Sequence, residues 1–222
     1  MGNREWLCGI RKKMEYLQEH LDGRVPWYAE NGRYISCRED FWVSGFWPGM
    51  LWIMYGMTGL EYFKDAAWQW DMRLEACFVR DNNLHHDVGF QFLPTAVIKY
   101  KLTGDEQARR RGLLAAGFLA GRFNPAGNFI RAWNQDKTGW AIIDSAMNLS
   151  LLFWAAEETG DPRFAHIARA HAQTVLTEFI RPDGSVCHVV SFDPFGGKKI
   201  EALGGQGYDG NSAWSRGQAW AI

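Results

Sequence analysis

The chain contains 222 residues, which is enough for one large domain or two small ones. Hydrophobic residues make up 47% and charged residues 22%, so the composition excludes a wholly disordered protein. The 24 Lys and Arg nearly balance the 25 Asp and Glu, so the sequence offers no broad basic field to hold a nucleic-acid backbone or an anionic membrane.

Three further features bear on location and function. No apolar run reaches the roughly 18 residues of a transmembrane helix, and the N-terminus lacks the basic-then-apolar layout of a secretory signal. The four cysteines lie far apart without a C-x-x-C pair, which favours reduced thiols and a cytoplasmic protein. The 12 Trp exceed what a core requires, so some are expected to line a surface that binds a ligand.

Eight helices are expected in chain order, and three of the turns between them repeat. A Thr-Gly pair closes a helix at Gly59, Gly104 and Gly160, where glycine suits the left-handed closing residue. Asp105 and Asp161 then suit the N-cap of the next helix. The predicted helices span 5–21, 47–57, 61–78, 90–103, 105–121, 145–158, 162–180 and 213–222.

Long connectors separate these helices, and they hold most of the polar and indole side chains. Because a single helical hairpin cannot bury its apolar stripe, the hairpins are expected to pack into a solenoid or a ring. The connectors between hairpins then gather at one end, which is the predicted site. One connector is expected to contain a small β-hairpin near residues 185–203.

Asp87 and Asp144 are candidates for acid–base chemistry because each stands just before an apolar helix. One interpretation is that each side chain caps its helix. The other is that the two carboxylates share one rim and face a pocket, where burial and like charge raise one pKa enough for a general acid.

Other motifs point to simpler roles. His85, His86 and Asp87 are adjacent, but neighbouring histidines point in different directions in most backbones and no H-x-x-x-H motif follows, so no metal is predicted. Cys37 and Cys187 are expected to be structural thiols. The sequence contains no nucleotide-binding or Ser-triad motif.

Several connector residues favour a carbohydrate cleft. Trp42, Trp133 and Trp214 lie beside polar groups, where an indole face either stacks on a sugar ring or packs in the core. Arg216 either pairs with the carboxylate of an acidic sugar or forms a salt bridge within the fold. Together with Gln206 and the histidines, these residues suggest a site for an acidic sugar.

Six blocks, in order, resemble the unsaturated glucuronyl hydrolases of glycoside hydrolase family 88. They are WVSGFWPGMLWIMY (42–55), HDVGFQFLPTAV (86–97), RFNPAGNFIRAWN (122–134), GWAIIDSAMNLSLLFWA (139–155), RPDGSVCHVVSFDP (181–194) and SAWSRGQAW (212–220). The resemblance implies an all-α fold, an (α/α)6 barrel with its site at one end, and a single catalytic domain over residues 1–222. Family members run well beyond this chain, so the sequence is expected to lack the C-terminal hairpins. Alternatively, a second copy or another chain, as in a homo-oligomer, covers the open barrel.

The resemblance also implies a substrate and its site. The expected substrate is an oligosaccharide whose non-reducing end is a 4,5-unsaturated uronic acid left by a polysaccharide lyase, and no metal or organic cofactor is expected. The implied catalytic residues are Asp144 and Asp87. The implied substrate-binding residues are Trp42, His86, Trp133, His188, Gln206, Trp214 and Arg216.

The chemistry follows from the enol ether of such a sugar. Asp144 is expected to protonate C4 and to assist the water that adds at C5, and Asp87 to keep Asp144 protonated and to stabilise the developing cation. Three alternatives stay open: a family 105-type hydrolase of unsaturated galacturonyl–rhamnose, a non-catalytic sugar-binding helical scaffold, and an isoprenoid-type cyclase. The sequence lacks the Asp-rich metal motif that the last alternative needs.

Overall fold

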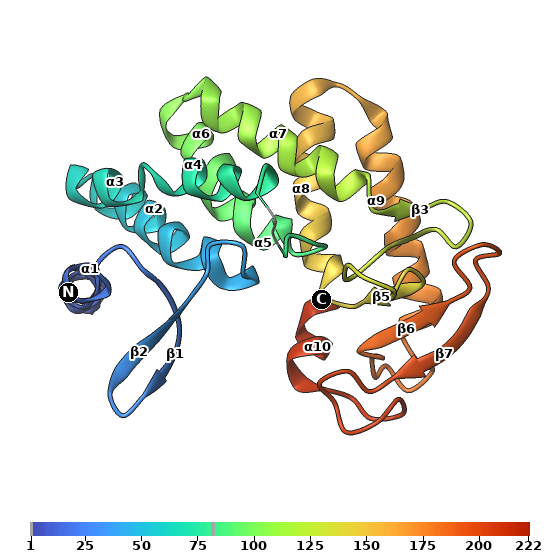
Figure 1. The fold of residues 1–222 in the computed structure, drawn as a ribbon. Coiled ribbons are helices and arrows are strands. Elements are labelled where there is room, and N and C mark those ends of the chain that lie inside the picture. Colours follow the sequence, from blue (N-terminus) through green and yellow to red (C-terminus); the bar gives the residue numbers. More distant parts are fainter. Residues whose placement is uncertain (1, 81–82) are drawn as a thin grey trace. The chain divides into compact units, whose positions relative to one another are not determined.

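The computed structural model describes residues 2–80 and 83–222, which form two compact units (Figure 1). The first unit comprises the described residues up to Arg80 together with Phe90–Arg111, and the second comprises Asn83–Gly89 and Gly112–Ile222. In these described stretches, no helix is both long and apolar enough to cross a bilayer. A single catalytic domain over residues 1–222 stays a prediction.

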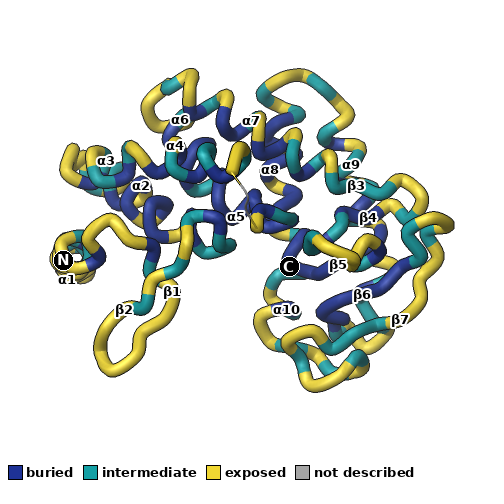
Figure 2. The backbone as a smooth tube through the Cα atoms, viewed as in Figure 1, coloured by how far each residue is buried: buried dark blue, intermediate teal, exposed yellow. Residues whose placement is uncertain are grey.

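The first unit is built of helices and one exposed β-hairpin (Figure 2). Its core contains side chains of α1, α2, α3 and α4, among them Met14, Trp47, Leu51, Phe63 and Trp70. Its elements are α1 (Gly2–Leu21), β1 (Val25–Glu30), β2 (Arg33–Cys37), η1 (Trp42–Gly45), α2 (Phe46–Thr58), α3 (Glu61–Ala67), α4 (Trp70–Glu75), η2 (Ala76–Phe78), the π-helical turn η3 (Leu93–Val97) and α6 (Ile98–Thr103). Two helices belong to both units: α5 (Val88–Phe92) and α7 (Glu106–Ala120).

Two predicted helices of this unit are interrupted. The helix expected over 61–78 ends at Ala67 and resumes at Trp70. Between the two helices, the Trp68 carbonyl accepts a hydrogen bond from the buried Lys99 ammonium at 3.0 Å. The helix expected over 90–103 begins at Val88 and widens into η3 around Pro94, because proline has no N–H to continue the regular ladder. The β1–β2 hairpin was not predicted.

The second unit places a three-stranded sheet beside helical hairpin α8–α9. Strand order is β5-β6-β7, with all pairs antiparallel, so the hairpin predicted near 185–203 is confirmed and β5 adds a third strand. The core packs Phe129, Ile143, Phe179, Val190 and Phe192 together. The elements are β3 (Phe123–Asn124), β4 (Phe129–Ile130), β5 (Trp140–Ile142), α8 (Ser145–Thr159), α9 (Pro162–Thr174), the π-helical turn η4 (Val175–Phe179), β6 (Val189–Phe192), β7 (Lys199–Leu203) and α10 (Ser215–Trp220).

The repeated Thr-Gly turn is confirmed at all three positions. Gly59, Gly104 and Gly160 have φ values of 68°, 71° and 69°, and each N–H closes the preceding helix. The preceding threonine bonds back to its helix and accepts from the residue that follows the glycine, as at Thr159. The same local chemistry therefore turns the chain three times.

Candidate active site

Asp144 stands where strand β5 runs directly into helix α8. The N–H of Ile143 donates to the carbonyl of His188 at 3.0 Å, which continues the β5–β6 pairing up to the helix start. Asp144 consequently enters α8 with helical dihedrals (φ −54°, ψ −27°), and its side chain makes no capping hydrogen bond. The capping interpretation is therefore wrong for Asp144. Its Oδ2 is buried and has no hydrogen-bond partner among the described residues.

His188 lies opposite this free oxygen, with its Nε2 3.7 Å from Oδ2 of Asp144. The backbone N–H of Gln206 donates to Nδ1 of His188 at 2.8 Å. The Gly204 carbonyl also lies 3.2 Å from Nδ1, so the Gln206 N–H and the Gly204 carbonyl both face this nitrogen. That buried Nε2 has no hydrogen-bond partner among the described residues. Two buried polar atoms without hydrogen-bond partners among the described residues therefore face each other.

The segment after β7 contacts His188 and contains three more of the predicted site residues. The indole of Trp214 lies 4.4 Å from the His188 ring, centroid to centroid. The guanidinium of Arg216 lies over the same indole at 4.1 Å and donates to the side-chain oxygen of Gln206 at 2.6 Å. Gln206 and Arg216 are exposed, so this group forms a rim beside the buried Asp144–His188 pair.

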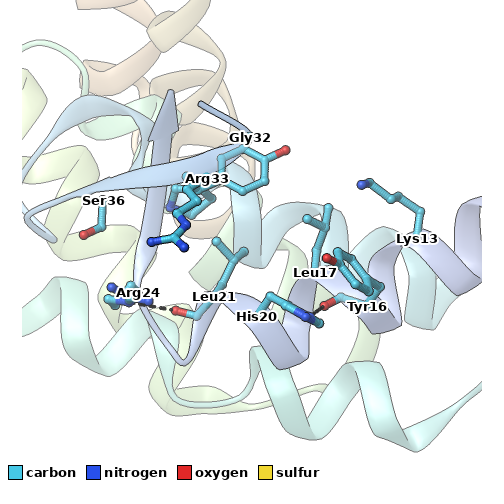
Figure 3. A pocket seen from close by; sticks show the side chains of 11 residues that line it. Lys13, Tyr16, Leu17, His20, Leu21, Arg24, Gly32, Arg33 and Ser36 are labelled. Atoms are coloured by element: carbon cyan, nitrogen blue, oxygen red, sulfur yellow. Dashed lines mark hydrogen bonds between the residues drawn. The ribbon is translucent and has the colours of Figure 1, made fainter. Parts of the chain in front are cut away.

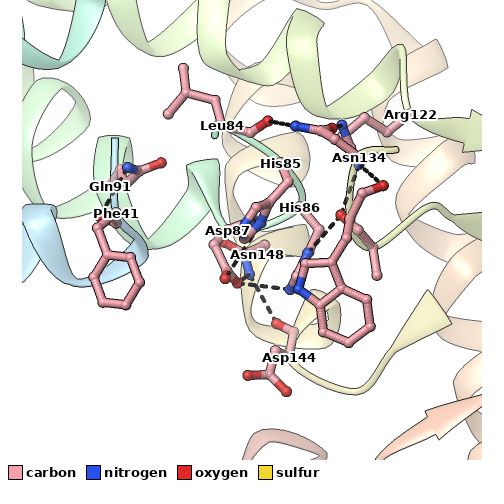
Figure 4. Close-up of polar contacts among 12 residues, drawn as sticks. Phe41, Leu84, His85, His86, Asp87, Gln91, Arg122, Asn134, Asp144 and Asn148 are labelled. Carbon is pink, nitrogen blue, oxygen red and sulfur yellow. Dashed lines mark hydrogen bonds and ion pairs between the residues drawn. The ribbon is translucent and has the colours of Figure 1, made fainter. Parts of the chain in front are cut away.

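Asp87 lies within a second polar cluster of the same unit (Figure 4). Its Oδ1 is 3.1 Å from Nε2 of His86 and accepts a long hydrogen bond of 3.4 Å from Asn148. The same Asn148 amide donates to the backbone carbonyl of Asp144 at 2.9 Å. A Cβ on Gly89 would overlap Asn148, so glycine at this position lets α5 approach α8. Asn148 thus links the carboxylate of Asp87 to the backbone of Asp144.

The charges of His86 and Asp87 stabilise each other. Burial lowers the pKa of His86, but the Asp87 carboxylate, the hydrogen bond to Ala132 and the charge of Asp144 outweigh burial and leave that pKa above its ordinary value. Burial raises the pKa of Asp87, but the charge and hydrogen bond of His86 leave it below its ordinary value. The buried pair therefore favours its charged form, an imidazolium beside a carboxylate.

His85 completes this cluster, contrary to the geometry expected for neighbouring histidines. The rings of His85 and His86 stack with centroids 4.6 Å apart, and the ligand atoms of His85, His86 and Asp87 lie within 4.8 Å of one another. The expectation that the two histidine rings point in different directions is thus wrong. Burial and the charge of His86 lower the pKa of His85 to about 3, so its ring is neutral. The absence of a metal from the site stays a prediction.

Trp133 lies on a loop that the half-buried Arg122 holds in place. Arg122 donates to the carbonyls of Arg131, Ala132 and Trp133 at 2.8–2.9 Å. The Trp133 indole meets the His86 ring edge-on at 5.9 Å, and the Lys137 ammonium lies 5.3 Å from the indole centre. The Ala132 carbonyl also accepts from Nδ1 of His86 at 2.9 Å, so this loop orients the histidine.

Trp42 and Cys37 belong to the first unit and are described there. Trp42 contacts the rings of Phe41, Phe46 and Phe90, and its side chain is half-buried. Burial raises the pKa of the Cys37 thiol to about 11, which is the opposite of what a nucleophilic thiolate needs. This agrees with a structural role for Cys37.

The structure adds residues that the sequence patterns missed. Asn148 and Ser145 are fully buried near Asp144, and the Oγ of Ser145 lacks a hydrogen-bond partner among the described residues. Asn148 stands four residues after Asp144, so helical spacing alone would have placed both on one face of α8. Arg122 gave no such signal, because its partners are three backbone carbonyls and the Asn134 side chain, 9 to 12 residues along the chain.

The sequence and the fold are similar to those of known proteins. No protein-family model matches the sequence. The chain is 36% identical over 217 residues to the unsaturated chondroitin disaccharide hydrolase of Streptococcus pyogenes serotype M1, covering 96% of the chain and 54% of that protein. It resembles the crystal structure of the unsaturated glucuronyl hydrolase of Bacillus sp. GL1 with a TM-score of 0.88 and 35% identity, covering 93% of this chain and 56% of that one.

A third similar structure contains a sugar. It is a variant of the Streptococcus agalactiae unsaturated glucuronyl hydrolase complexed with dGlcA-GalNAc6S, with a TM-score of 0.70 and 27% identity, covering 96% of this chain and 55% of that one. The predicted α/α-barrel fold class is confirmed by these likenesses. The chain spans about half the length of the curated relatives it matches.

Proposed function

This chain is homologous to unsaturated glucuronyl hydrolases over nearly all of its length, and we propose that it acts as such a hydrolase. In this proposal it removes a non-reducing terminal 4,5-unsaturated uronic acid from an oligosaccharide of glycosaminoglycan type. The observation that carries the proposal is the buried Oδ2 of Asp144 facing the buried Nε2 of His188, both without a hydrogen-bond partner among the described residues. Buried polar groups left without partners are costly, which favours a ligand that completes them.

Asp144 is the proposed general acid. It donates a proton to C4 of the enol ether, and positive charge develops at C5 and the ring oxygen. Water then adds at C5 and returns a proton to Asp144, which gives a hemiketal. The hemiketal opens to a ketone at C5 and leaves a hemiacetal at C1, which releases the second sugar as an alcohol. In this scheme, no bond at C1 is attacked directly, unlike in ordinary glycosidases.

Asp87 is proposed to act through its charge. Its ionised carboxylate lies beside the site in the ion pair with His86, where a negative charge favours the developing oxocarbenium ion. Asn148 holds Asp87 and the Asp144 backbone in a fixed relation. The expected role of Asp87 in keeping Asp144 protonated stays a prediction.

The remaining residues are proposed to bind the sugar. Arg216, with Gln206, offers donors to the uronate carboxylate at an exposed rim. Trp214 and Trp133 present indole faces to the sugar rings, and His188 donates from Nε2. Trp42 of the first unit stays a predicted contact, and the cytoplasmic location and the homo-oligomer likewise stay predictions.

Three substrates test this proposal. The chain is incubated with an unsaturated chondroitin disaccharide, an unsaturated heparin disaccharide and unsaturated galacturonyl–rhamnose, and the absorbance of the conjugated double bond is followed. We expect loss of absorbance with the glucuronyl substrates and, in D2O, one deuterium at C4 of the product. Turnover of galacturonyl–rhamnose alone would favour the family 105-type alternative, and binding without turnover would favour the sugar-binding scaffold.

A further inference from the structure

The first unit contains a cleft of about 620 Å³ between helix α1 and the β1–β2 hairpin (Figure 3). This volume lies within the roughly 300–1,000 Å³ of ligand sites in proteins. Side chains of Lys13, His20, Arg24 and Arg33 line it together with Tyr16 and Tyr34. The chemistry assigned to Asp144 uses none of these residues.

One face of helix α1 forms one side of the cleft. Lys13, Tyr16, Leu17, His20 and Leu21 are spaced by three or four residues, so they share one face of α1. Leu21 ends the helix and packs in the core of the unit, which fixes this face toward the hairpin.

The hairpin turn supplies the other side. Asn31 and Gly32 both have positive φ values, 48° and 75°, as the tight two-residue turn of a twisted hairpin requires. The turn pairs Glu30 with Arg33, and Arg33, Tyr34 and Ser36 line the cleft from β2. Arg24 follows the end of α1, where its Nε donates to the Leu21 carbonyl at 3.2 Å.

The cleft is electropositive because basic side chains line it, whereas the acidic side chains of α1 lie elsewhere. No carboxylate lines the cleft, and Lys13, Arg24 and Arg33 form no ion pair with any described residue. The acidic residues of α1 lie elsewhere: Glu15 pairs with Arg11 at 3.5 Å. Burial raises the pKa of Tyr62, and the charges of Glu19 and Glu15 add to that rise, which places both acids near α3.

Aromatic and apolar surface lies between these cations. Tyr16 and Tyr34 remain about half exposed, at 51% and 47%. The His20 ring stacks on Tyr16 with centroids 3.8 Å apart, and its Nδ1 bonds the Tyr16 carbonyl at 2.7 Å, which leaves Nε2 for a ligand. Flat rings beside cations suit a sugar that carries anionic substituents, because the ring face stacks while the anion accepts hydrogen bonds.

We propose that this cleft binds a sulfated or carboxylated sugar unit, with Arg24 and Arg33 as the main anion donors and Tyr16 and Tyr34 as stacking surfaces. Such a site would hold an acidic oligosaccharide on the protein without taking part in its hydrolysis. The choice of a sugar as ligand rests on the proposed function, whereas the binding of an anion rests on the cleft alone.

The test measures binding of a saturated chondroitin 6-sulfate tetrasaccharide to the full chain by calorimetry. Saturation removes the double bond that Asp144 is proposed to protonate, so the measurement is independent of turnover. The double variant Arg24→Gln/Arg33→Gln is compared with Lys12→Gln/Arg169→Gln, in which both altered residues are exposed and lie outside the cleft. We expect the Kd of the cleft variant to rise about tenfold or more, which corresponds to the loss of one charge-assisted hydrogen bond. The Kd of the control variant should change less than twofold. Circular dichroism melting shows whether both variants fold.

Two further ligands separate the sources of the anion. Inorganic sulfate should compete only at far higher concentration than the tetrasaccharide, because it lacks the ring surface. Equal loss of binding in the two double variants, or tighter binding of single-stranded DNA of equal charge, would overturn the proposal. Turnover of the unsaturated disaccharide should persist in the cleft variant. Absence of turnover in the wild-type chain contradicts the proposed function but leaves this binding result to stand.

Discussion

The starts of helices α8 and α9 show how one residue type in one local position takes two roles. Asp161 precedes α9 with an extended backbone (φ −87°, ψ 110°), and its carboxylate accepts from the N–H of Arg163 at 3.0 Å. Asp144 precedes α8 with helical dihedrals, makes no capping bond and is 9% exposed. The two differ because α9 follows a Thr-Gly turn, whereas α8 follows strand β5, whose pairing with β6 fixes the backbone.

A carboxylate is therefore available for chemistry when its backbone conformation prevents it from capping the helix that follows. The Asp161 carboxylate is occupied by Arg163, whose side chain and N–H together lower the pKa of Asp161. The Asp144 carboxylate keeps an unpartnered oxygen beside His188. Five experiments test the site and this contrast.

The largest effect is expected from Asp144→Asn. The amide cannot supply the proton, so kcat on an unsaturated disaccharide should fall by about 10²–10⁴, the usual contribution of a positioned acid or base. Thermal stability should change little, because no capping bond is lost. Asp161→Asn is the matched control and should leave kcat unchanged; similar rates in both variants would break the contrast.

The second experiment concerns the buried pair behind Asp87. His86→Gln should lower the free energy of unfolding by about 3–5 kcal/mol, because it leaves a buried carboxylate without its charged partner. Urea denaturation measures the loss, and His86→Gln/Asp87→Asn should recover part of it. If the single and double variants are equally unstable, the pairing is not the cause.

The pH dependence of the same pair has a defined window. The contribution of His86, whose pKa is raised, is complete below the ordinary value of 6.5 and is lost as pH rises through the raised pKa. The contribution of Asp87, whose pKa is lowered, is complete above the ordinary value of 3.8 and is lost as pH falls through the lowered pKa. The stability difference between the wild type and the double variant should therefore be largest between these values.

Gly205→Ala should give a smaller effect that reaches Asp144 through His188. Gly205 has a φ of 58°, and a Cβ there would overlap Nδ1 of His188. We expect about 1–3 kcal/mol of destabilisation from the backbone and a roughly tenfold fall in kcat from the displaced ring. Gly184→Ala is the control, since its φ is 82° but a Cβ would meet nothing within 4 Å. Equal loss of kcat in both would mean that the His188 contact is unimportant.

The smallest effect is expected from Asp161→Ala, which removes the cap together with an exposed ion pair to Arg163. The melting temperature should fall by a few degrees, because the first turn of α9 loses an acceptor for its N–H groups. Disaccharide turnover should stay at the wild-type rate. A loss of turnover with unchanged stability would contradict the assignment of Asp161 to capping and of Asp144 to catalysis.

Much of the fold could be predicted because its signals are local. Glycine at a left-handed helix end and Asp at an extended N-cap depend only on nearby backbone geometry, so Gly104 and Asp161 were predicted correctly. The β6–β7 hairpin followed from its alternating residues and turn. The breaks at Trp68 and Pro94 were missed because hydrophobic periodicity passes through them, and the first depends on the distant Lys99.

The sequence by itself determined that Asp87, Asp144 and a set of connector residues are candidates for chemistry on an acidic sugar. It left open whether each carboxylate caps a helix, because that depends on dihedrals fixed by strand pairing far along the chain. Only the tertiary structure decided that Asp144 is uncapped, that the Gln206 N–H lies against Nδ1 of His188, and that Asn148 joins the Asp87 carboxylate to the Asp144 backbone. The physical reason is that the Gln206–His188 and Asn148–Asp87 contacts join residues 18 and 61 positions apart, where no local propensity acts.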